Sequence, residues 1–204
     1  MKLYYAPGAC SLAPHIVARE AGLPLTLIKV DTQRHTVGGT DYFSINPKGQ
    51  VPVLELDDGG RLTEGPVVAQ YIADKAQAQS LVPAAGTLAR YRVMEWQNYV
   101  TSELHKSFTP LFMGLVEGPS KDTAIKVLEK KLDWLDGQLE GRKHLTGEDF
   151  TAADAYLFTV LRWAQFVSID ISSRRHLARF MATVGQRPAV QAALHAEGLP
   201  ALGQ

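Results

Sequence analysis

The sequence contains 204 residues, of which 46% are apolar and 21% are charged, a composition typical of folded globular proteins. Its 21 basic residues balance its 21 acidic residues, so the formal net charge is zero and neither nucleic acid nor an anionic membrane is an expected partner. The longest stretch without charge, Leu3–Ala18, is too short and too broken by proline and glycine to span a bilayer. The N-terminus lacks the pattern of a signal peptide, so we expect a cytoplasmic protein.

The chain contains one cysteine, Cys10. A single thiol excludes an internal disulfide and a metal site built from several thiolates. No two histidines have the spacing of metal ligands, so we expect neither a metal nor another bound cofactor. Any sulfur chemistry therefore uses Cys10 alone or with a thiol from another molecule.

Residues 1–77 show an alternation of strand and helix patterns. We expect a strand at Lys2–Tyr5, a helix capped by Ser11 and ending at Gly22, a strand at Leu25–Val30, a loop over Asp31–Lys48, a hairpin of Val51–Leu56 with Arg61–Thr63, and a helix from Pro66 to Asp74. This order predicts a small mixed α/β domain, a sheet covered by helices.

Residues 87–204 show only helical patterns, after an uncharged segment at 76–86 that resembles a linker. We expect a helix from Thr87 that Pro110 bends or ends, a helix over Ala124–Leu139, a buried helix from a capping box at Thr151–Asp154 to Phe166 with Phe150 as its hydrophobic staple, and helices near Leu177–Val184 and Pro188–Glu197. The second domain is therefore expected to be an all-α bundle.

Cys10 lies where the first strand gives way to the first helix. Unpaired N–H groups and the helix dipole favour a thiolate there, which predicts a pKa below about 8.5 and a nucleophile or thiolate-binding group. The alternative is a small buried apolar residue.

Two further turns can recognise a peptide. A cis bond between Val51 and Pro52 would leave the Val51 N–H and C=O free to pair with an extended chain. Glu64 and the N–H of Gly65, at the start of the next helix, could hold the ammonium and carboxylate of an amino acid. The simpler alternative for Glu64 is a charge that stabilises the helix dipole.

Five motifs in order resemble the cytosolic glutathione transferases, in detail their bacterial beta class: YYAPGACSLAPHI, INPKGQVPVLELDDG, LTEGP, ELHKSF and GEDFTAADAYLF. The resemblance runs from residue 1 to about residue 198. It implies a thioredoxin-like N-terminal domain (1–77) that binds glutathione as co-substrate and an all-helical domain (87–204) that lines the site for a small electrophile. It also implies a homodimer.

The resemblance implies roles for individual residues. Cys10 would face the glutathione sulfur, Val51 would pair with the cysteinyl backbone, and Glu64 with the N–H of Gly65 would hold the γ-glutamyl end. Five residues of the long helix would reach the site, the first and third from the partner subunit: Asn98, Ser102, Glu103, Leu104 and His105.

The chain departs from the family in the loop after Asp31, where Arg34 and His35 replace a usual lysine pair. Either His35 or Arg34 would then pair with the glycyl carboxylate. Tyr4 and Tyr5 are rivals of Cys10 as stabilisers of the thiolate.

The other histidines are expected to be structural or solvated. His15, in the first helix, is expected to be structural, and three histidines near helix ends or loops are expected to be solvated: His144, His176 and His195.

Two adjacent thiolates repel each other, so Cys10 would either donate its S–H to the glutathione sulfur or form a mixed disulfide with it. His105 could donate or accept a proton in both cases. A mixed disulfide would need a second glutathione to resolve it, because the chain has no second cysteine. We expect an enzyme that conjugates glutathione to small hydrophobic electrophiles, the alternatives being a glutathione-dependent reductase or dehalogenase, or a non-catalytic regulatory protein of the same fold.

Overall fold

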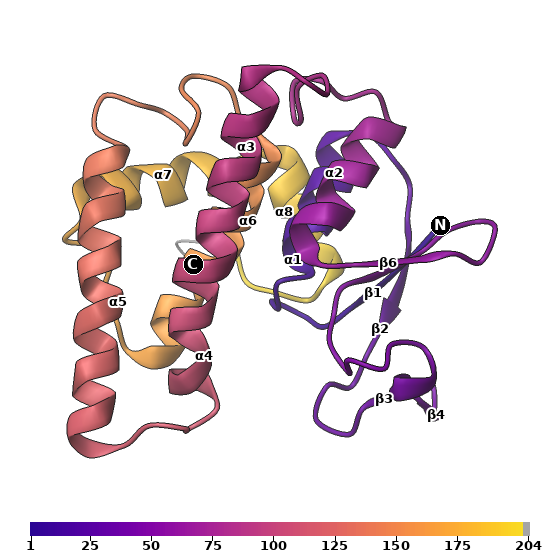
Figure 1. Ribbon diagram of the computed structural model, residues 1–204, viewed down its shortest axis with the longest axis horizontal. Helices are drawn as coiled ribbons and strands as arrows, with labels where there is room; N and C mark the ends of the chain where they lie inside the picture. Colours follow the sequence, from indigo (N-terminus) through magenta and orange to yellow (C-terminus); the bar gives the residue numbers. More distant parts are fainter. Residues whose placement is uncertain (202–204) are drawn as a thin grey trace.

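The computed structural model describes residues 1–201, and its N-terminal part is built on a four-stranded sheet (Figure 1). The strands are β1 (Lys2–Tyr5), β2 (Thr26–Lys29), β5 (Val53–Glu55) and β6 (Arg61–Thr63). They lie in the order β2-β1-β5-β6, with β1 parallel to β2 and the other two pairs antiparallel. The mixed sheet expected from the sequence is therefore present.

Two helices of this part, α1 (Leu12–Glu20) and α2 (Gly65–Lys75), pack against each other and bury their apolar residues. The segment expected to be a loop contains a short hairpin of β3 (Thr36–Val37) and β4 (Thr40–Asp41), followed by a 3₁₀ turn at Tyr42–Ser44. Two-residue strands carry too little alternation to be recognised from sequence.

Ser11 does not cap α1 as predicted. Its hydroxyl lies 3.2 Å from both the backbone nitrogen and the backbone oxygen of Ala6. The side chain therefore joins the end of β1 to the start of α1, and it fixes the turn that carries Cys10.

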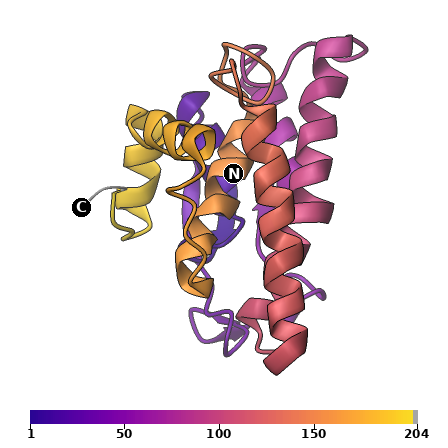
Figure 2. The ribbon, with the colours of Figure 1, turned by 90° about the vertical axis from the view of Figure 1, so that its left-hand side faces the viewer.

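The C-terminal part is helical, as expected. Its helices are α3 (Leu88–Tyr99), α4 (Lys106–Phe112), α5 (Gly118–Gln138), α6 (Ala152–Leu161), α7 (Arg175–Gly185) and α8 (Pro188–Ala196). Every residue of α6 is buried, and the helix packs against α1, α3 and α7 (Figure 2). The chain continues after α6 as a 3₁₀ helix at Arg162–Val167, so the helix expected to reach Phe166 tightens in its last turns.

Val100–His105 forms a π-helical segment between α3 and α4. The three pieces make one long helix, and Pro110 lies inside its last piece without ending it. Hydrogen bonds from i to i+5 wind the π segment more loosely than an α-helix, so positions counted at 100° per residue no longer predict which side chains share a face.

The segment 76–86 is packed rather than free. Leu81 and Val82 are buried, and the Leu81 carbonyl accepts a hydrogen bond from the N–H of Ala152 at 2.9 Å. One continuous apolar core therefore joins the sheet, α1 and the bundle.

The predicted capping box is present. Asp154 accepts hydrogen bonds at 2.8 Å from the N–H and the hydroxyl of Thr151 and from the N–H of Leu145. Within residues 1–201, no helix is long and apolar enough to cross a membrane.

Candidate functional site

A cavity of about 330 Å³ lies where the N-terminal part meets the long helix of the C-terminal part. Five of the residues singled out in the sequence line it together: Cys10, Val51, Glu64, Gly65 and His105. A cavity of this size with convergent polar groups is the usual form of a small-molecule site.

The Cys10 thiol lies at the wall of this cavity, with Sγ 3.2 Å from the carbonyl oxygen of Val51. Removal from water raises the pKa of Cys10 to about 11, although its own N–H and that of Ser11 act in the opposite direction. The prediction of a pKa below 8.5 is therefore wrong for the protein without ligand. Cys10 is a neutral thiol that donates to Val51.

The turn before Cys10 is fixed on both sides by the C-terminal part. The Gly8 N–H donates to the carboxylate of Glu197 at 3.0 Å, and the Gly8 carbonyl accepts from the indole N–H of Trp163 at 2.8 Å. The buried ring of His15 lies 2.9 Å from the same Glu197 carboxylate, which confirms the structural role expected for this histidine. The position of Cys10 therefore depends on residues more than 150 positions away.

The Val51-Pro52 bond is cis, as the sequence suggested. The carbonyl of Gln50, just before it, accepts hydrogen bonds from the Tyr42 hydroxyl at 2.9 Å and from the Asn46 amide at 2.6 Å. These two hydrogen bonds therefore fix the turn that places the Val51 backbone at the cavity.

Glu64 has a left-handed backbone, with φ of 68°, immediately before α2. A non-glycine residue in this region stores strain of about 1–3 kcal/mol, which typically marks a functional position. Its half-exposed carboxylate pairs with the ammonium of Lys48, which also lies 2.8 Å from the Thr63 hydroxyl. The carboxylate of Glu64 therefore lies at the cavity, paired with a cation of the neighbouring segment.

His105 reaches the cavity from the end of the π-helical segment. Its Nδ1 lies 2.8 Å from the hydroxyl of Tyr156 on α6, and its ring packs edge-on against Trp163 at 4.7 Å between centroids. Burial, and to a lesser degree the charge of Lys106, lower the pKa of His105 to about 4. The imidazole is therefore neutral at pH 7, and it acts as a hydrogen-bonding group rather than as a cation.

The remaining predicted site residues do not line the cavity of their own chain. Leu104 is fully buried in the core, Ser102 donates back to the Asn98 carbonyl, and Glu103 pairs with Lys131 at 2.9 Å. His35 lies behind the cavity wall, where its ring packs on Phe43 at 4.6 Å. Ser102, Glu103 and Leu104 belong to the π-helical segment and His35 precedes the short hairpin, two elements that the sequence did not reveal.

Arg34, the alternative to His35, and the two tyrosines considered as stabilisers of the thiolate, Tyr4 and Tyr5, do not line the cavity either. Arg34 is highly exposed and lies 3.5 Å from Asp31. Tyr4 donates to Glu55 at 3.2 Å, and Tyr5 is buried. None of the three is a wall of the cavity around Cys10.

Two histidines expected to be solvated are buried. His144 bonds to the Glu148 carbonyl at 2.7 Å and packs against Phe150, whereas His176 lies in the buried face of α7. The prediction is wrong for these two and right for exposed His195.

Five residues that line the cavity were not predicted from the sequence: Lys48, Gln50, Thr101, Lys106 and Tyr156. Lys48 and Lys106 are cations. Lys48 lies three residues before Val51 in the same short segment, and this closeness in sequence could have pointed to it. Tyr156 had no signal, because it stands in an apolar helix where an aromatic residue is ordinary core.

Fold and site together define a glutathione-dependent enzyme with a thioredoxin-like domain, a thiol at a helix start and a helical domain over the cavity. Comparison with known proteins agrees. The family model of the glutathione S-transferase N-terminal domain matches residues 8–75, and the model of the C-terminal domain matches residues 100–188. The chain belongs to the glutathione S-transferase family, and it is an enzyme of that family.

Two relatives illustrate the likeness. The chain is 49% identical to glutathione S-transferase GstA of Escherichia coli O157:H7, and 39% identical to glutathione S-transferase GST-4.5 of Xanthomonas campestris pv. campestris. Each alignment covers 98% of this chain and 100% of the relative.

Solved structures of glutathione S-transferases also resemble this chain over nearly its whole length. A bacterial beta-class glutathione S-transferase of Sphingomonas chungbukensis superposes with a TM-score of 0.94 at 43% identity, and a sphingomonad enzyme complexed with glutathione superposes with 0.93 at 44%. Each covers 98% of this chain and 100% of the other. The membership expected from the sequence motifs is thereby confirmed.

Proposed function

We propose that this transferase conjugates reduced glutathione to small hydrophobic electrophiles, with glutathione as co-substrate and no other cofactor. The observation that carries the proposal is the meeting of Cys10, Val51, Glu64 and Gly65 in one cavity beside His105. This set offers an S–H donor and strand-like backbone for the cysteinyl unit, and a carboxylate with a helix-start N–H for the γ-glutamyl end.

In the proposed binding mode, Glu64 and the Gly65 N–H take the γ-glutamyl ammonium and carboxylate. Lys48, which lines the cavity beside Glu64, supplies a positive charge for a glutathione carboxylate. Lys48 takes over the role first considered for His35 or Arg34, since neither of those residues lines the cavity.

Cys10 acts in this scheme as a hydrogen-bond donor. Its S–H turns from the Val51 carbonyl to the sulfur of bound glutathione, and the Val51 backbone becomes free to pair with the cysteinyl unit. A neutral donor beside a thiolate avoids repulsion between two anions. Each unit by which such contacts lower the pKa of glutathione corresponds to about 1.4 kcal/mol.

Thiol–disulfide exchange is the second activity we consider. The Cys10 thiolate would attack the glutathionyl sulfur of a mixed disulfide between glutathione and another thiol, which releases that thiol and leaves glutathione bound to Cys10. A reduced glutathione thiolate would then attack the same glutathionyl sulfur, which forms oxidised glutathione and frees Cys10. Burial raises the pKa of Cys10 to about 11 and leaves little thiolate at neutral pH, which slows the attack step of the exchange.

The electrophile side of the proposal rests on an aromatic cluster next to His105. Trp163 packs edge-on against Phe108 and Phe112, with ring centroids 5.9 and 5.6 Å away, and Phe112 is partly exposed. A surface of aromatic rings favours small apolar or aromatic electrophiles, such as aryl halides.

We propose a homodimer in which Asn98 and Glu103 reach the glutathione of the partner subunit. Asn98 is exposed and Glu103 is half-exposed, and neither lines the cavity of its own chain. Because π-helical bonds join i to i+5, the π turn rotates these two residues toward a common face. Sedimentation with and without glutathione tests the assignment, since a monomer that binds and turns over normally contradicts it.

We place the enzyme in the cytoplasm, where reduced glutathione is maintained. The activity is tested by retention of the full chain on immobilised glutathione and by the absorbance change on conjugation of chlorodinitrobenzene. Glu64→Gln should lose retention, whereas Glu140→Gln, an exposed carboxylate outside the cavity, should keep it. Retention of both variants together with no conjugation by the wild type would overturn the proposal.

A further inference from the structure

Tyr156 is a buried phenol in the wall of the glutathione cavity, and the proposed binding mode gives it no role. It belongs to α6, which packs against the π-helical segment that carries His105. Its hydroxyl oxygen lies 2.8 Å from Nδ1 of His105. Burial raises the pKa of Tyr156, so the hydroxyl keeps its proton at neutral pH. A buried hydroxyl has to donate that proton to an acceptor, because leaving it unpaired costs about 1–3 kcal/mol.

Two groups can accept the proton of Tyr156, namely Nδ1 of His105 and the hydroxyl oxygen of Thr101. The Thr101 hydroxyl approaches Tyr156 and donates its own proton to the Gln97 carbonyl at 2.8 Å. An imidazole nitrogen is a far stronger base than an alcohol oxygen, and so it is the better acceptor. The geometry agrees, because within residues 1–201 the hydrogen bond that Tyr156 makes is the one with Nδ1.

This hydrogen bond decides where the ring of His105 carries its proton. Burial lowers the pKa of His105 to about 4, so the ring is neutral at pH 7 and holds one proton on one of its two nitrogens. If Nδ1 accepts from Tyr156, that proton is on Nε2. Nε2 makes no hydrogen bond within residues 1–201, and it is not sealed from the cavity that His105 lines. Trp163 packs edge-on against the ring at 4.7 Å and restricts its rotation.

We propose that Tyr156 is a positioning residue that holds His105 in the tautomer with the proton on Nε2, so that the ring presents an N–H donor to the sulfur of glutathione. The inference rests on the proposed function, in which His105 lies beside that sulfur. With the S–H of Cys10, the cavity then offers two neutral donors to one thiolate and brings no second anion near it. Tyr156 acts only through the ring.

The first test reads the tautomer of the free wild-type chain by ¹⁵N–¹H NMR, since the couplings of the ring nitrogens to the ring protons differ between the two forms. Among the six histidines, the signals of His105 are those missing from His105→Ala. We expect the Nε2–H form at pH 7, and a mixture of both forms in Tyr156→Phe. This measurement needs neither turnover nor bound glutathione, so it does not depend on the proposed function.

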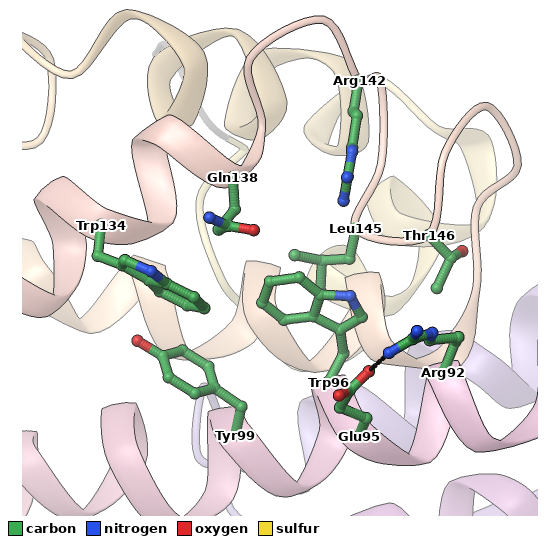
Figure 3. Close-up of a pocket in the computed structure, with 9 residues that line it drawn as sticks. All are labelled: Arg92, Glu95, Trp96, Tyr99, Trp134, Gln138, Arg142, Leu145 and Thr146. Atoms are coloured by element: carbon green, nitrogen blue, oxygen red, sulfur yellow. Dashed lines mark hydrogen bonds and ion pairs between the residues drawn. The ribbon is translucent and has the colours of Figure 1, made fainter.

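The second test is kinetic and compares two deletions of a hydroxyl. Tyr156→Phe keeps the ring and removes the hydrogen bond to His105. Tyr99→Phe is the control, because the Tyr99 ring lies against Trp134 in a separate pocket between α3 and α5 (Figure 3). With chlorodinitrobenzene, kcat should fall about two- to tenfold in Tyr156→Phe, which corresponds to one hydrogen bond, and should stay unchanged in Tyr99→Phe. The dissociation constant of glutathione should be the same in both variants and the wild type.

A double-variant cycle shows whether Tyr156 acts through His105. In the His105→Ala background, Tyr156→Phe should cause no further loss of kcat, because the group through which it acts is gone.

Three results would overturn the inference. The first is the Nδ1–H tautomer as the main form of the wild type, which would mean that Tyr156 donates to Thr101. The second is an unchanged kcat in Tyr156→Phe. The third is an undiminished loss from Tyr156→Phe in the His105→Ala background, which would make Tyr156 a donor to the sulfur in its own right. Absence of conjugation by the wild type would instead overturn the proposed function, and the tautomer would still decide the inference.

Discussion

The two halves of the glutathione cavity are built in different ways. The N-terminal half presents mainly backbone and short local motifs, namely the turn before Cys10, the cis turn at Val51 and the strained start of α2 at Glu64. The helical half presents side chains, His105 and Tyr156, from two helices far apart in sequence. In the proposed binding mode, the first half holds the peptide of glutathione, whereas side chains of the second half lie beside its sulfur.

This difference explains why the helix start alone does not make Cys10 acidic. Burial of the thiol raises its pKa, and the local N–H groups lower it by less, so the pKa of Cys10 is raised to about 11. In the proposed binding mode, the backbone of the N-terminal half holds glutathione, whereas burial sets the protonation of both Cys10 and His105.

The largest effect is expected for Cys10→Ala, which removes the only thiol. Mixed-disulfide formation with oxidised glutathione should be abolished, while part of the conjugation of aryl halides remains because the helix start still favours the glutathione anion. Mass spectrometry after incubation with oxidised glutathione should show one adduct on the wild type only. An adduct on the variant would contradict the assignment of the thiol.

Glu64→Gln tests the peptide-recognising half. Loss of the carboxylate that meets the γ-glutamyl ammonium should weaken glutathione binding by about ten- to thirtyfold, in line with about 1.5–2 kcal/mol for a hydrogen bond to a charged group. Fluorescence or calorimetric titration with glutathione measures the change. Unchanged affinity for glutathione would mean that Glu64 only stabilises the helix dipole.

His105→Ala tests the helical half. Turnover of an aryl halide should fall about tenfold, equivalent to about 1.4 kcal/mol, while the dissociation constant of glutathione changes little, because the ring acts on the reacting sulfur. Steady-state kinetics beside a binding titration separate the two quantities. Equal losses in both would make His105 a plain binding residue, no different in kind from Glu64.

The last prediction concerns the pH dependence of stability. The pKa of His105 is about 4 in the folded protein and about 6.5 in the unfolded chain, so the unfolded chain binds more protons between these values. The free energy of unfolding contributed by this residue should therefore fall as pH drops from 6.5 to 4, by at most about 1.4 kcal/mol per pH unit.

Urea denaturation of the wild type and of His105→Ala across this range measures that contribution. Carboxylates whose pKa the fold lowers, such as Glu103 and Asp74, are common to both proteins and contribute equally to the two curves. The wild type should lose more stability than the variant, and parallel curves would show that the ring is not shielded from water.

The fold was predictable wherever the signal was local. Alternating strands, the capping box of Thr151 with Asp154 and the helix ends at Gly22 and Gly198 all follow from neighbouring residues. The π turn was not predictable, because no residue type marks it, and it moved Asn98 and Glu103 relative to a regular helix.

In the candidate site, too, only the features that depend on neighbouring residues were predictable. Motifs of the N-terminal half located Val51 and Glu64, but the pKa of Cys10 depends on packing that only the folded chain creates. Tyr156, which lines the cavity, and Trp163, which fixes the turn before Cys10, were also missed, because aromatic residues in an apolar stretch are ordinary core residues.

The central claim is that Cys10 is a neutral thiol in the free enzyme, and the pH dependence of its alkylation tests this most directly. With a single cysteine, mass spectrometry reports the rate of modification by iodoacetamide at one site. The account predicts a rate at pH 7 well below that of a free thiol, rising without a plateau up to about pH 10. A plateau reached below about pH 8.5 would show a thiolate stabilised by the helix start and would contradict it.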